Sequence, residues 1–416
     1  MTKRRVDLLV LGSKETITVD GTRDSDNLGI IDGGGVAINN GAIVQAASSQ
    51  LLERKYRAKS VVDVTDEIVL PGFVDPHTHL VFNGSREEEF QLRVRGVPYM
   101  EVLRRGRGIL ETVNRTRQTG PEELLRISVK RLNTALEAGT TTAEIKSGYG
   151  LRLHDELKIL KITERLAQQH PCRIVTTFLG AHAIPPDYPD PRDYVRTVIE
   201  EMLPRVQAEK VAQFCDVFCE QGAFDAKLSL KILKAATRLG LRPKIHADEF
   251  SNSGGTRVAN KTLAVSADHL VHSPPKELER MLETGVTPVL LPASSHSLLM
   301  SQYAKAREML SMGLPVALGT DFSPANWVLG QLTVAAVAAR QLRMTAAEII
   351  RGITINAAKA LGLDRKIGSI SPGKEADLTI LRAPNHKWIG YTFGESIVDK
   401  VLIGGKVVVD NGKRVR

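Results

Sequence analysis

Two histidines, His77 and His79, lie two residues apart in the apolar stretch PGFVDPHTHLVF, residues 71–82. Because the side chains of a β-strand alternate between its two faces, a strand here would point both imidazoles to the same side. Two converging neutral imidazoles suit a divalent ion such as zinc. Surface histidines also occur at this spacing without any function, so a metal site requires further ligands at the ends of other strands.

Three further stretches place residues that can bind a metal or transfer a proton next to apolar runs. RPKIHADEF contains His246 and Glu249, SADHLVHS contains His269, and PVALGTDFSP contains Asp321. If these strand ends meet, three imidazoles and one carboxylate can converge on one ion, and the carboxylate can also take a proton. Each residue has a structural alternative: His246 as a core histidine, Asp321 as a turn former, and His269 as a hydrogen-bonding residue at a strand end. Their joint occurrence favours a metal site.

The chain from Gly72 to about Leu361 has the pattern needed to bring such ends together. Eight strand candidates are separated mostly by amphipathic helical stretches, such as residues 122–139, whose apolar stripe ends at Gly139. This count predicts an α/β fold with a TIM-like (β/α)8 barrel, in which the active site lies at the C-terminal ends of the strands. The candidates are GFVDPHTHLVF, TTAEIKSGYG, RIVTTFLGAHA, CDVFCEQGAF, RPKIHADEF, SADHLVHS, VTPVLLPASS and PVALGTDFSP.

Both ends of the chain have a different texture, with short apolar runs and tight turns. Asn40-Gly41 stands between two strand-like halves, the strongest short-range signal for a hairpin, and Gly404-Gly405 and Asn411-Gly412 occupy turn positions near the C-terminus. We predict that residues 1–65 and 362–416 form one small composite β-sandwich domain beside a barrel at 66–361.

The composition is that of an ordinary soluble globular protein, with 42% hydrophobic and 25% charged residues among 416. The sequence contains no apolar run of about eighteen residues, so we expect no membrane partner. The basic start lacks the features of a signal peptide, and the three cysteines are too few for a disulfide framework, which predicts a cytoplasmic location. The net charge of +9 is compatible with nucleic-acid binding, but Lys and Arg are scattered and no binding motif occurs. We therefore expect a small anionic substrate and no nucleic-acid partner.

The chain resembles the amidohydrolase superfamily over nearly its whole length, from PGFVDPHTHLVFNGSREEEF to GSISPGKEADLTIL. Within it, GSREEEF and IKSGYGL resemble the imidazolonepropionase family, as do TFLGAHAIPPDY, KIHADEF, SADHLVH and NAAKALGL. The resemblance implies one zinc or iron ion per chain, held by His77, His79, His246 and Asp321. Binuclear relatives bridge two metals with a modified lysine on strand four, and CDVFCEQGAF contains no lysine.

The resemblance also implies an activity: hydrolysis of the cyclic amide bond of 4-imidazolone-5-propanoate to N-formimidoyl-L-glutamate, the third step of histidine degradation. This reaction needs an activated water, a group that stabilises the carbonyl oxygen as it becomes anionic, and a proton for the leaving nitrogen. We assign Asp321 as proton acceptor and His269 as hydrogen-bond donor to the oxyanion. Glu249 would orient the substrate ring and shuttle a proton.

A propanoate is best recognised by the planar fork of an arginine, and the resemblance gives this role to Arg86. The alternative is that Arg86 pairs with one of the glutamates at 87–89 on a solvated face. Tyr149 and His182 match further substrate contacts of the family, with a loop-packing tyrosine and a backbone-bonded histidine as their alternatives.

Ser323, Ala325 and Asn326 fall in a loop that contacts substrate or product in the family. The family usually has Asn-Pro-Gly followed by Ser or Thr there, so Ala325 removes a backbone freedom that glycine would supply, and Asn326 is bulkier than serine. These differences bear on the pocket and leave the metal ligands unchanged.

Two other functions stay open. The first is a related mononuclear amidohydrolase that acts on another cyclic amide or deaminates a heterocyclic base; Arg86 and Tyr149 discriminate, since a base deaminase has no flexible carboxylate to bind. The second is a non-enzymatic barrel scaffold, which we would expect to have lost metal ligands. The resemblance also suggests a homodimer.

Overall fold

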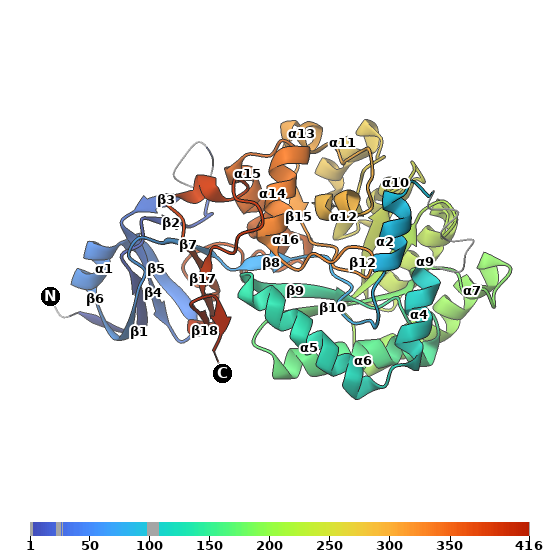
Figure 1. Ribbon diagram of the computed structural model, residues 1–416, viewed down its shortest axis with the longest axis horizontal. Coiled ribbons are helices and arrows are strands. Elements are labelled where there is room, and N and C mark those ends of the chain that lie inside the picture. Colours follow the sequence, from blue (N-terminus) through green and yellow to red (C-terminus); the bar gives the residue numbers. More distant parts are fainter. Residues whose placement is uncertain (1–2, 22–25, 27, 98–107, 416) are drawn as a thin grey trace.

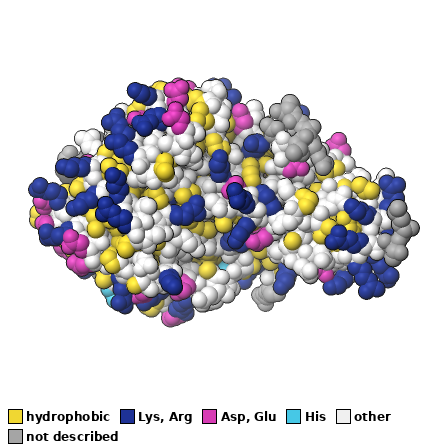
Figure 2. All heavy atoms as spheres, turned by 180° about the vertical axis from the view of Figure 1, so that it is seen from behind, with side chains coloured by type: hydrophobic (Ala, Val, Ile, Leu, Met, Phe, Trp, Pro, Cys, Tyr) yellow, Lys and Arg dark blue, Asp and Glu magenta, His cyan; other side chains and the backbone are white. Residues whose placement is uncertain are grey.

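The computed structural model describes residues 3–21, 26, 28–97 and 108–415. A barrel ringed by helices makes up most of the molecule, and a β-rich domain that contains both ends of the chain lies at one side (Figure 1). Among the described residues, no helix combines the length and the apolar character needed to cross a membrane. Lys and Arg side chains are spread over the face seen from behind, with a group at the end formed by the β-rich domain (Figure 2).

The barrel sheet consists of eight strands in the order β15-β14-β13-β12-β11-β10-β9-β8, and each neighbouring pair is parallel. Every one of the eight strand candidates contributes one strand, so the predicted barrel is confirmed. The strands are β8 (Phe73–Asp75), β9 (Thr140–Lys146), β10 (Arg173–Ala181), β11 (Phe214–Cys219), β12 (Arg242–Ala247), β13 (Ser266–His269), β14 (Thr287–Leu290) and β15 (Ala317–Leu318).

The first predicted strand is shorter than we expected. Residues 71–82 do not form one strand: β7 (Ile68–Pro71) pairs within the terminal domain, β8 ends at Asp75, and the two histidines follow in an extended segment. Pro71 and Pro76 have no N–H to donate, which is one reason why a continuous ladder cannot form here. The seam between the first and last strands is closed beyond their ends, where Asp321 N donates to His77 O at 3.0 Å and His79 N donates to Phe322 O at 2.8 Å.

Helices follow most of the barrel strands and pack around them. In α5 the predicted apolar stripe is buried except at Ile127, which is partly exposed, and the helix is followed by Gly139 at φ +95°, where an added Cβ would lie 2.7 Å from the Phe73 ring. The helices of the barrel are α2 (Glu87–Val94), α4 (Ile109–Gln118), α5 (Pro121–Glu137), α6 (Leu153–Gln169), α7 (Pro191–Thr197), the π-helical η1 (Val198–Met202), α8 (Leu203–Glu209), α9 (Ala226–Arg238), α10 (Gly255–Thr262), α11 (Pro275–Thr284), α12 (Pro292–Ser297), α13 (Ala306–Ser311), α14 (Gln331–Gln341), α15 (Ala346–Ile353) and α16 (Ile355–Ala360).

The terminal domain is built from both ends of the chain, as predicted. One sheet has the order β5-β4-β1-β6, and the other has the order β19-β18-β17-β16-β7-β2-β3. Buried residues of both sheets, including Val10, Ile38 and Ile380, form one shared core. The elements are β1 (Arg4–Leu11), β2 (Glu15–Ile17), β3 (Ile30–Asp32), β4 (Gly34–Asn39), β5 (Ala42–Ser48), α1 (Ser49–Lys55), β6 (Tyr56–Asp63), β16 (Leu378–Leu381), the short 3-10 helix η2 (His386–Trp388), β17 (Val398–Ile403), β18 (Lys406–Asp410) and β19 (Lys413–Arg414).

The three predicted turns connect antiparallel strands of this domain. Asn40 and Gly41 join β4 to β5, with Asn39 opposite Ala42, and both turn residues have positive φ. The turns at 404–405 and 411–412 join β17 to β18 and β18 to β19. The domain limits at residues 65 and 361 stay a prediction; β7, which lies just inside the predicted barrel range, pairs with β16 and β2 of the terminal sheet.

Candidate metal centre and active site

A cavity of about 980 Å³ opens at the C-terminal ends of the barrel strands. Its apolar wall includes Ile109, Leu110 and Phe218, while most of the predicted site residues supply polar groups. The predicted residues that line it are His79, Arg86, Tyr149, His182, His246, Glu249, His269, Asp321, Ser323 and Ala325. The remaining predicted ligand, His77, lies fully buried directly beneath.

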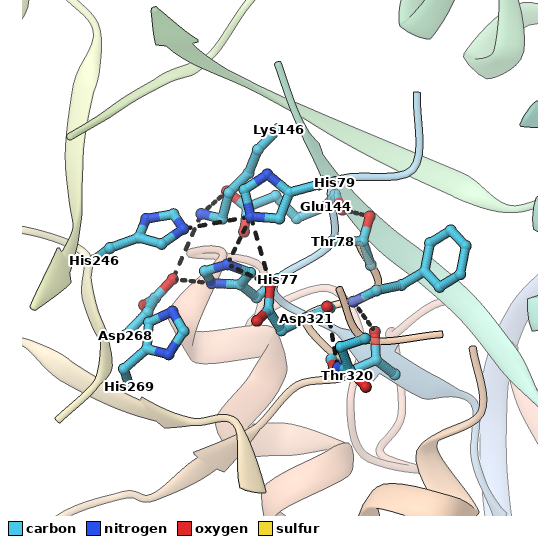
Figure 3. A network of polar contacts seen from close by, with 12 residues as sticks. His77, Thr78, His79, Glu144, Lys146, His246, Asp268, His269, Thr320 and Asp321 are labelled. Carbon is cyan, nitrogen blue, oxygen red and sulfur yellow. Dashed lines mark hydrogen bonds and ion pairs between the residues drawn. The ribbon is translucent and has the colours of Figure 1, made fainter. Parts of the chain in front are cut away.

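The four predicted metal ligands come together at the floor of this cavity (Figure 3). The Nε2 atom of His79 lies 3.3 Å from Nε2 of His77 and 3.4 Å from Nε2 of His246. Oδ1 of Asp321 lies 3.5 Å from the Nε2 atoms of both His77 and His79. Two overlapping groups, His77 with His246 and His269, and His79 with His182 and His246, also bring their ligand atoms within 4.8 Å of one another.

The chemistry of this donor set fits a divalent cation. Burial, with the neighbouring positive groups, holds the pKa values of His77 and His79 well below 6.5, so both rings are neutral, the form that binds metals. Neutral imidazoles whose Nε2 atoms converge at such distances gain little from one another. A cation between them and the Asp321 carboxylate satisfies all the converging lone pairs at once.

Carboxylates behind two of these histidines fix their ring orientations. Oδ2 of Asp268 lies 2.6 Å from Nδ1 of His77, and Oδ2 of Asp216 lies 3.0 Å from Nδ1 of His246. A carboxylate at Nδ1 favours the tautomer that leaves Nε2 free to bind a metal. Both Asp216 and Asp268 are completely buried.

Asp321 is held in a backbone conformation that few residue types adopt. Its φ of +52° lies in the left-handed region, which Asp and Asn tolerate better than most side chains. Burial raises the pKa of its carboxyl group to about 6, although a hydrogen bond from Ser294 opposes the shift. A buried carboxylate whose pKa lies near neutrality is suited to accept a proton.

Glu249 and His269 form a second pair on the cavity wall. Nδ1 of His269 lies 3.5 Å from Oε1 of Glu249, and Nε2 of His269 is buried with no hydrogen-bond partner among the described residues. Burial raises the pKa of Glu249 well above 4.5, and the charges of Asp321 and Glu220 add to this effect. Burial likewise keeps the pKa of His269 well below 6.5. Burial therefore shifts Glu249 towards its protonated form and keeps the His269 imidazole neutral.

The predicted substrate contacts lie around the mouth of the cavity. Arg86, half-buried, donates from Nε to Thr112 Oγ1 at 3.1 Å and lines the cavity. The His182 ring stacks on His79 with centroids 4.9 Å apart, and its Nδ1 lies 3.1 Å from Gly148 O. The backbone contact expected of a structural histidine is therefore present, but His182 also faces the cavity. The Tyr149 ring packs 5.3 Å from that of His182.

Asn326 differs from the prediction. Its side chain does not line the cavity: Nδ2 donates to Thr320 O at 2.7 Å and to Asp321 O at 3.2 Å, and Oδ1 accepts from Ser297. Asn326 therefore supports the backbone of the loop that follows β15, because its amide is fully engaged there. Ala325 lines the cavity without a positive φ, so the backbone freedom of glycine is not needed at this position.

Comparison with known proteins identifies the family. Residues 68–408 match the model of the amidohydrolase family. An imidazolonepropionase from Alkaliphilus oremlandii is 44% identical over 394 residues, which cover 94% of this chain and 93% of that protein. An imidazolonepropionase from Geobacillus kaustophilus is 43% identical over 419 residues, covering 98% of this chain and 99% of that protein. The chain belongs to the amidohydrolase family, among the imidazolonepropionases.

Solved structures support the same fold for this amidohydrolase. A zinc-bound adenosine deaminase from Xanthomonas campestris superposes with a TM-score of 0.77 at 20% identity, over 100% of this chain and 95% of that one. An ochratoxinase from A. niger superposes with a TM-score of 0.73 at 18% identity, over 99% and 97% of the two chains. At these identities the likeness concerns the fold alone.

Sequence reasoning missed one part of this amidohydrolase site, the carboxylate of Asp216, and gave Asp268 no role of its own. A signal was available: Asp216 interrupts the apolar run FCDVFC, and a charged residue inside a buried strand needs a partner. Which partner it has depends on how neighbouring strands are aligned, and one sequence does not give that register.

Proposed function

We propose that this amidohydrolase hydrolyses the cyclic amide bond of 4-imidazolone-5-propanoate to give N-formimidoyl-L-glutamate, a step of histidine degradation. The observation that carries the proposal is the presence, in one cavity, of the convergent His and Asp cluster and of Arg86. Hydrolysis of a small anionic lactam needs both features: the His and Asp cluster to break the amide bond, and Arg86 to bind the carboxylate. Relatives of the same length, named imidazolonepropionases, agree with this assignment.

One zinc or iron ion is held by His77, His79, His246 and Asp321 in this proposal. These four residues are favoured over the two all-histidine groups because they combine three imidazole nitrogens with the only carboxylate in the three candidate groups of the described chain. When bound, the ion lowers the pKa of a coordinated water towards ~7 and polarises the carbonyl group.

The chain's own residues move the protons. Asp321 accepts a proton from the attacking water at its buried carboxylate. His269 donates from Nε2, which has no partner among the described residues, to the carbonyl oxygen as it becomes anionic. Glu249, whose raised pKa favours the protonated carboxyl, supplies the proton to the leaving ring nitrogen and hydrogen-bonds the ring. At the end of the cycle, the proton accepted by Asp321 passes to Glu249 and restores its acid form.

The propanoate is bound at the outer part of the cavity. The guanidinium of Arg86 pairs with the carboxylate, and Tyr149 and His182 pack against the ring and its chain. Ser323 and Ala325, in the loop that follows β15, form the wall on that side. The three cysteines are buried and unpaired, which supports the cytoplasmic location we propose. The homodimer stays a prediction.

The test is turnover of freshly prepared 4-imidazolone-5-propanoate, followed by the appearance of N-formimidoyl-L-glutamate, with Asp321→Asn as control. Product from the wild type alone is the expected result. Absence of product from protein shown to hold its metal would refute this substrate. Other cyclic amides that carry a carboxylate would then be tested, because Arg86 lines the same cavity whichever ring is bound.

A further inference from the structure

A group of completely buried charges lies beneath the metal ligands, inside the barrel. It consists of two lysines and three carboxylates from four barrel strands: Glu144 and Lys146 of β9, Asp216 of β11, Lys244 of β12 and Asp268 of β13. Charged side chains are almost never buried without partners, because the loss of hydration is costly. A group of five buried charged side chains therefore indicates a specific role for these residues.

Lys146 occupies the centre of this group. Its Nζ lies 2.7 Å from Oδ2 of Asp216, 3.1 Å from Oε1 of Glu144 and 3.4 Å from Oδ2 of Asp268. Figure 3 shows its ammonium group directed at Asp268, between the histidines. The two Oδ2 atoms that Lys146 contacts are the same atoms that contact the metal-site histidines, Asp216 to His246 and Asp268 to His77. The Lys146 ammonium group therefore contacts two separate carboxylates, and each of these carboxylates contacts one of the proposed metal ligands.

We propose that Lys146 is a positioning residue that orients two metal ligands together, His77 through Asp268 and His246 through Asp216. The proposal rests on the proposed function, because it takes these histidines as ligands. Without the ammonium group, two buried carboxylates would face each other with no cation to separate them. Each would move away from the other, and each would take its histidine out of alignment.

Lys244 provides a natural comparison, since it is equally buried and also pairs with Glu144. Its Nζ lies 2.7 Å from Oε2 of Glu144 and donates to the backbone oxygen of Pro76 at 3.1 Å. Its contacts are thus with Glu144 and the backbone, whereas Lys146 contacts the carboxylates behind both ligands. If Lys146 had only a structural role, its replacement should affect the protein in the same way as the replacement of Lys244.

The test compares the zinc affinity of the full-length wild type, Lys146→Met and Lys244→Met, measured by competition with a chromophoric chelator. Loss of a residue that supports the ligands costs about 10–100-fold in metal affinity, and we expect this for Lys146→Met. We expect a much smaller loss for Lys244→Met. With cobalt as a probe, the visible absorption spectrum should change in Lys146→Met and remain that of the wild type in Lys244→Met. Equal losses and equal spectra in the two variants would overturn the proposal.

Removal of a buried lysine can prevent folding. A second pair of variants therefore removes one buried positive charge and one buried negative charge from each protein. Asp268→Asn is combined with Lys146→Met in one protein and with Lys244→Met in the other. The first should still bind zinc more weakly, because Asp216 has lost its cation; equal affinities would overturn the proposal. A wild type that fails to bind zinc at this site would instead refute the proposed metal centre. The two failures are therefore distinguishable.

Discussion

Replacement of Asp321 by asparagine separates its chemistry from its structural role. Asparagine has nearly the same shape and tolerates the left-handed backbone at φ +52°. The backbone N–H of Asp321 donates to His77 O, and the backbone carbonyl of Asp321 accepts from Asn326 Nδ2. Neither hydrogen bond depends on the carboxylate. The variant should therefore fold, and any loss can be traced to the carboxylate itself.

The loss of the proton acceptor should lower kcat by about 10²–10⁴-fold, the usual contribution of a positioned general base. This corresponds to roughly 3–5 kcal/mol in the activation free energy. The assay is product formation under saturating substrate, with metal content determined on the same samples. Turnover within about tenfold of the wild type, at equal metal content, would remove Asp321 from the proton-acceptor role.

The same variant tests the electrostatics of the site without metal. Burial raises the pKa of Asp321 from 3.8 to about 6. The folded protein therefore holds this proton more tightly than the unfolded chain, and its stability relative to a neutral side chain falls as the pH rises through about 4 to 6. Two pKa units correspond to about 3 kcal/mol. At pH 8, metal-free Asp321→Asn should be more stable than metal-free wild type by up to about this amount.

Urea unfolding at pH 4 and pH 8 measures this difference, and the buried histidines, which both proteins share, cancel in the comparison. The advantage of the variant should be nearly absent at pH 4 and fully present at pH 8. A metal-free variant less stable than the wild type at pH 8 would refute the conclusion that burial makes the ionised carboxylate unfavourable here.

Three further outcomes follow from the site. Arg86→Ala should raise KM about 10–100-fold with kcat little changed, because a charge-assisted hydrogen bond contributes roughly 1.5–3 kcal/mol; an unchanged KM in steady-state assays would exclude the carboxylate contact. The kcat/KM of the wild type should fall as the pH rises through the raised pKa of Glu249, whose acid form donates the proton, and Glu249→Gln should lose that alkaline limb; a limb that persists in the variant argues against this donor. Elemental analysis should find about one zinc or iron ion per chain, removable by a chelator together with activity, and two tightly bound ions would contradict a mononuclear site.

The barrel and most of the site could be predicted from the sequence for a physical reason. Parallel strands in a barrel all end at one rim, so a polar residue after an apolar run has a known location even when its neighbours are unknown. His246, His269 and Asp321 each follow such a run, and all three line the cavity. The hairpin at Asn40-Gly41 could also be predicted from the sequence, because its turn needs two residues that accept positive φ.

Contacts that depend on the alignment of distant strands could not be predicted in this way. Lys146 reaches Asp216 and Asp268 only because β9, β11 and β13 place these residues at one level of the barrel interior. The family resemblance predicted a substrate contact for Asn326, whereas its amide donates to the backbone oxygens of Thr320 and Asp321. A side chain that can bind either substrate or backbone takes whichever the fold places nearer.

The seam of the barrel positions three of the proposed metal ligands, His77, His79 and Asp321, which lie outside regular strands. β8 and β15 are not paired with each other as strands, and the bonds that join their extensions belong to the ligand segments, from Asp321 N to His77 O and from His79 N to Phe322 O. Thr320 adds to this seam by donating from N and Oγ1 to the Asp75 carboxylate at 3.0 and 2.6 Å. Closure of the barrel and convergence of His77, His79 and Asp321 are thus the same structural event. A barrel that closes in this register must also bring these three ligands together.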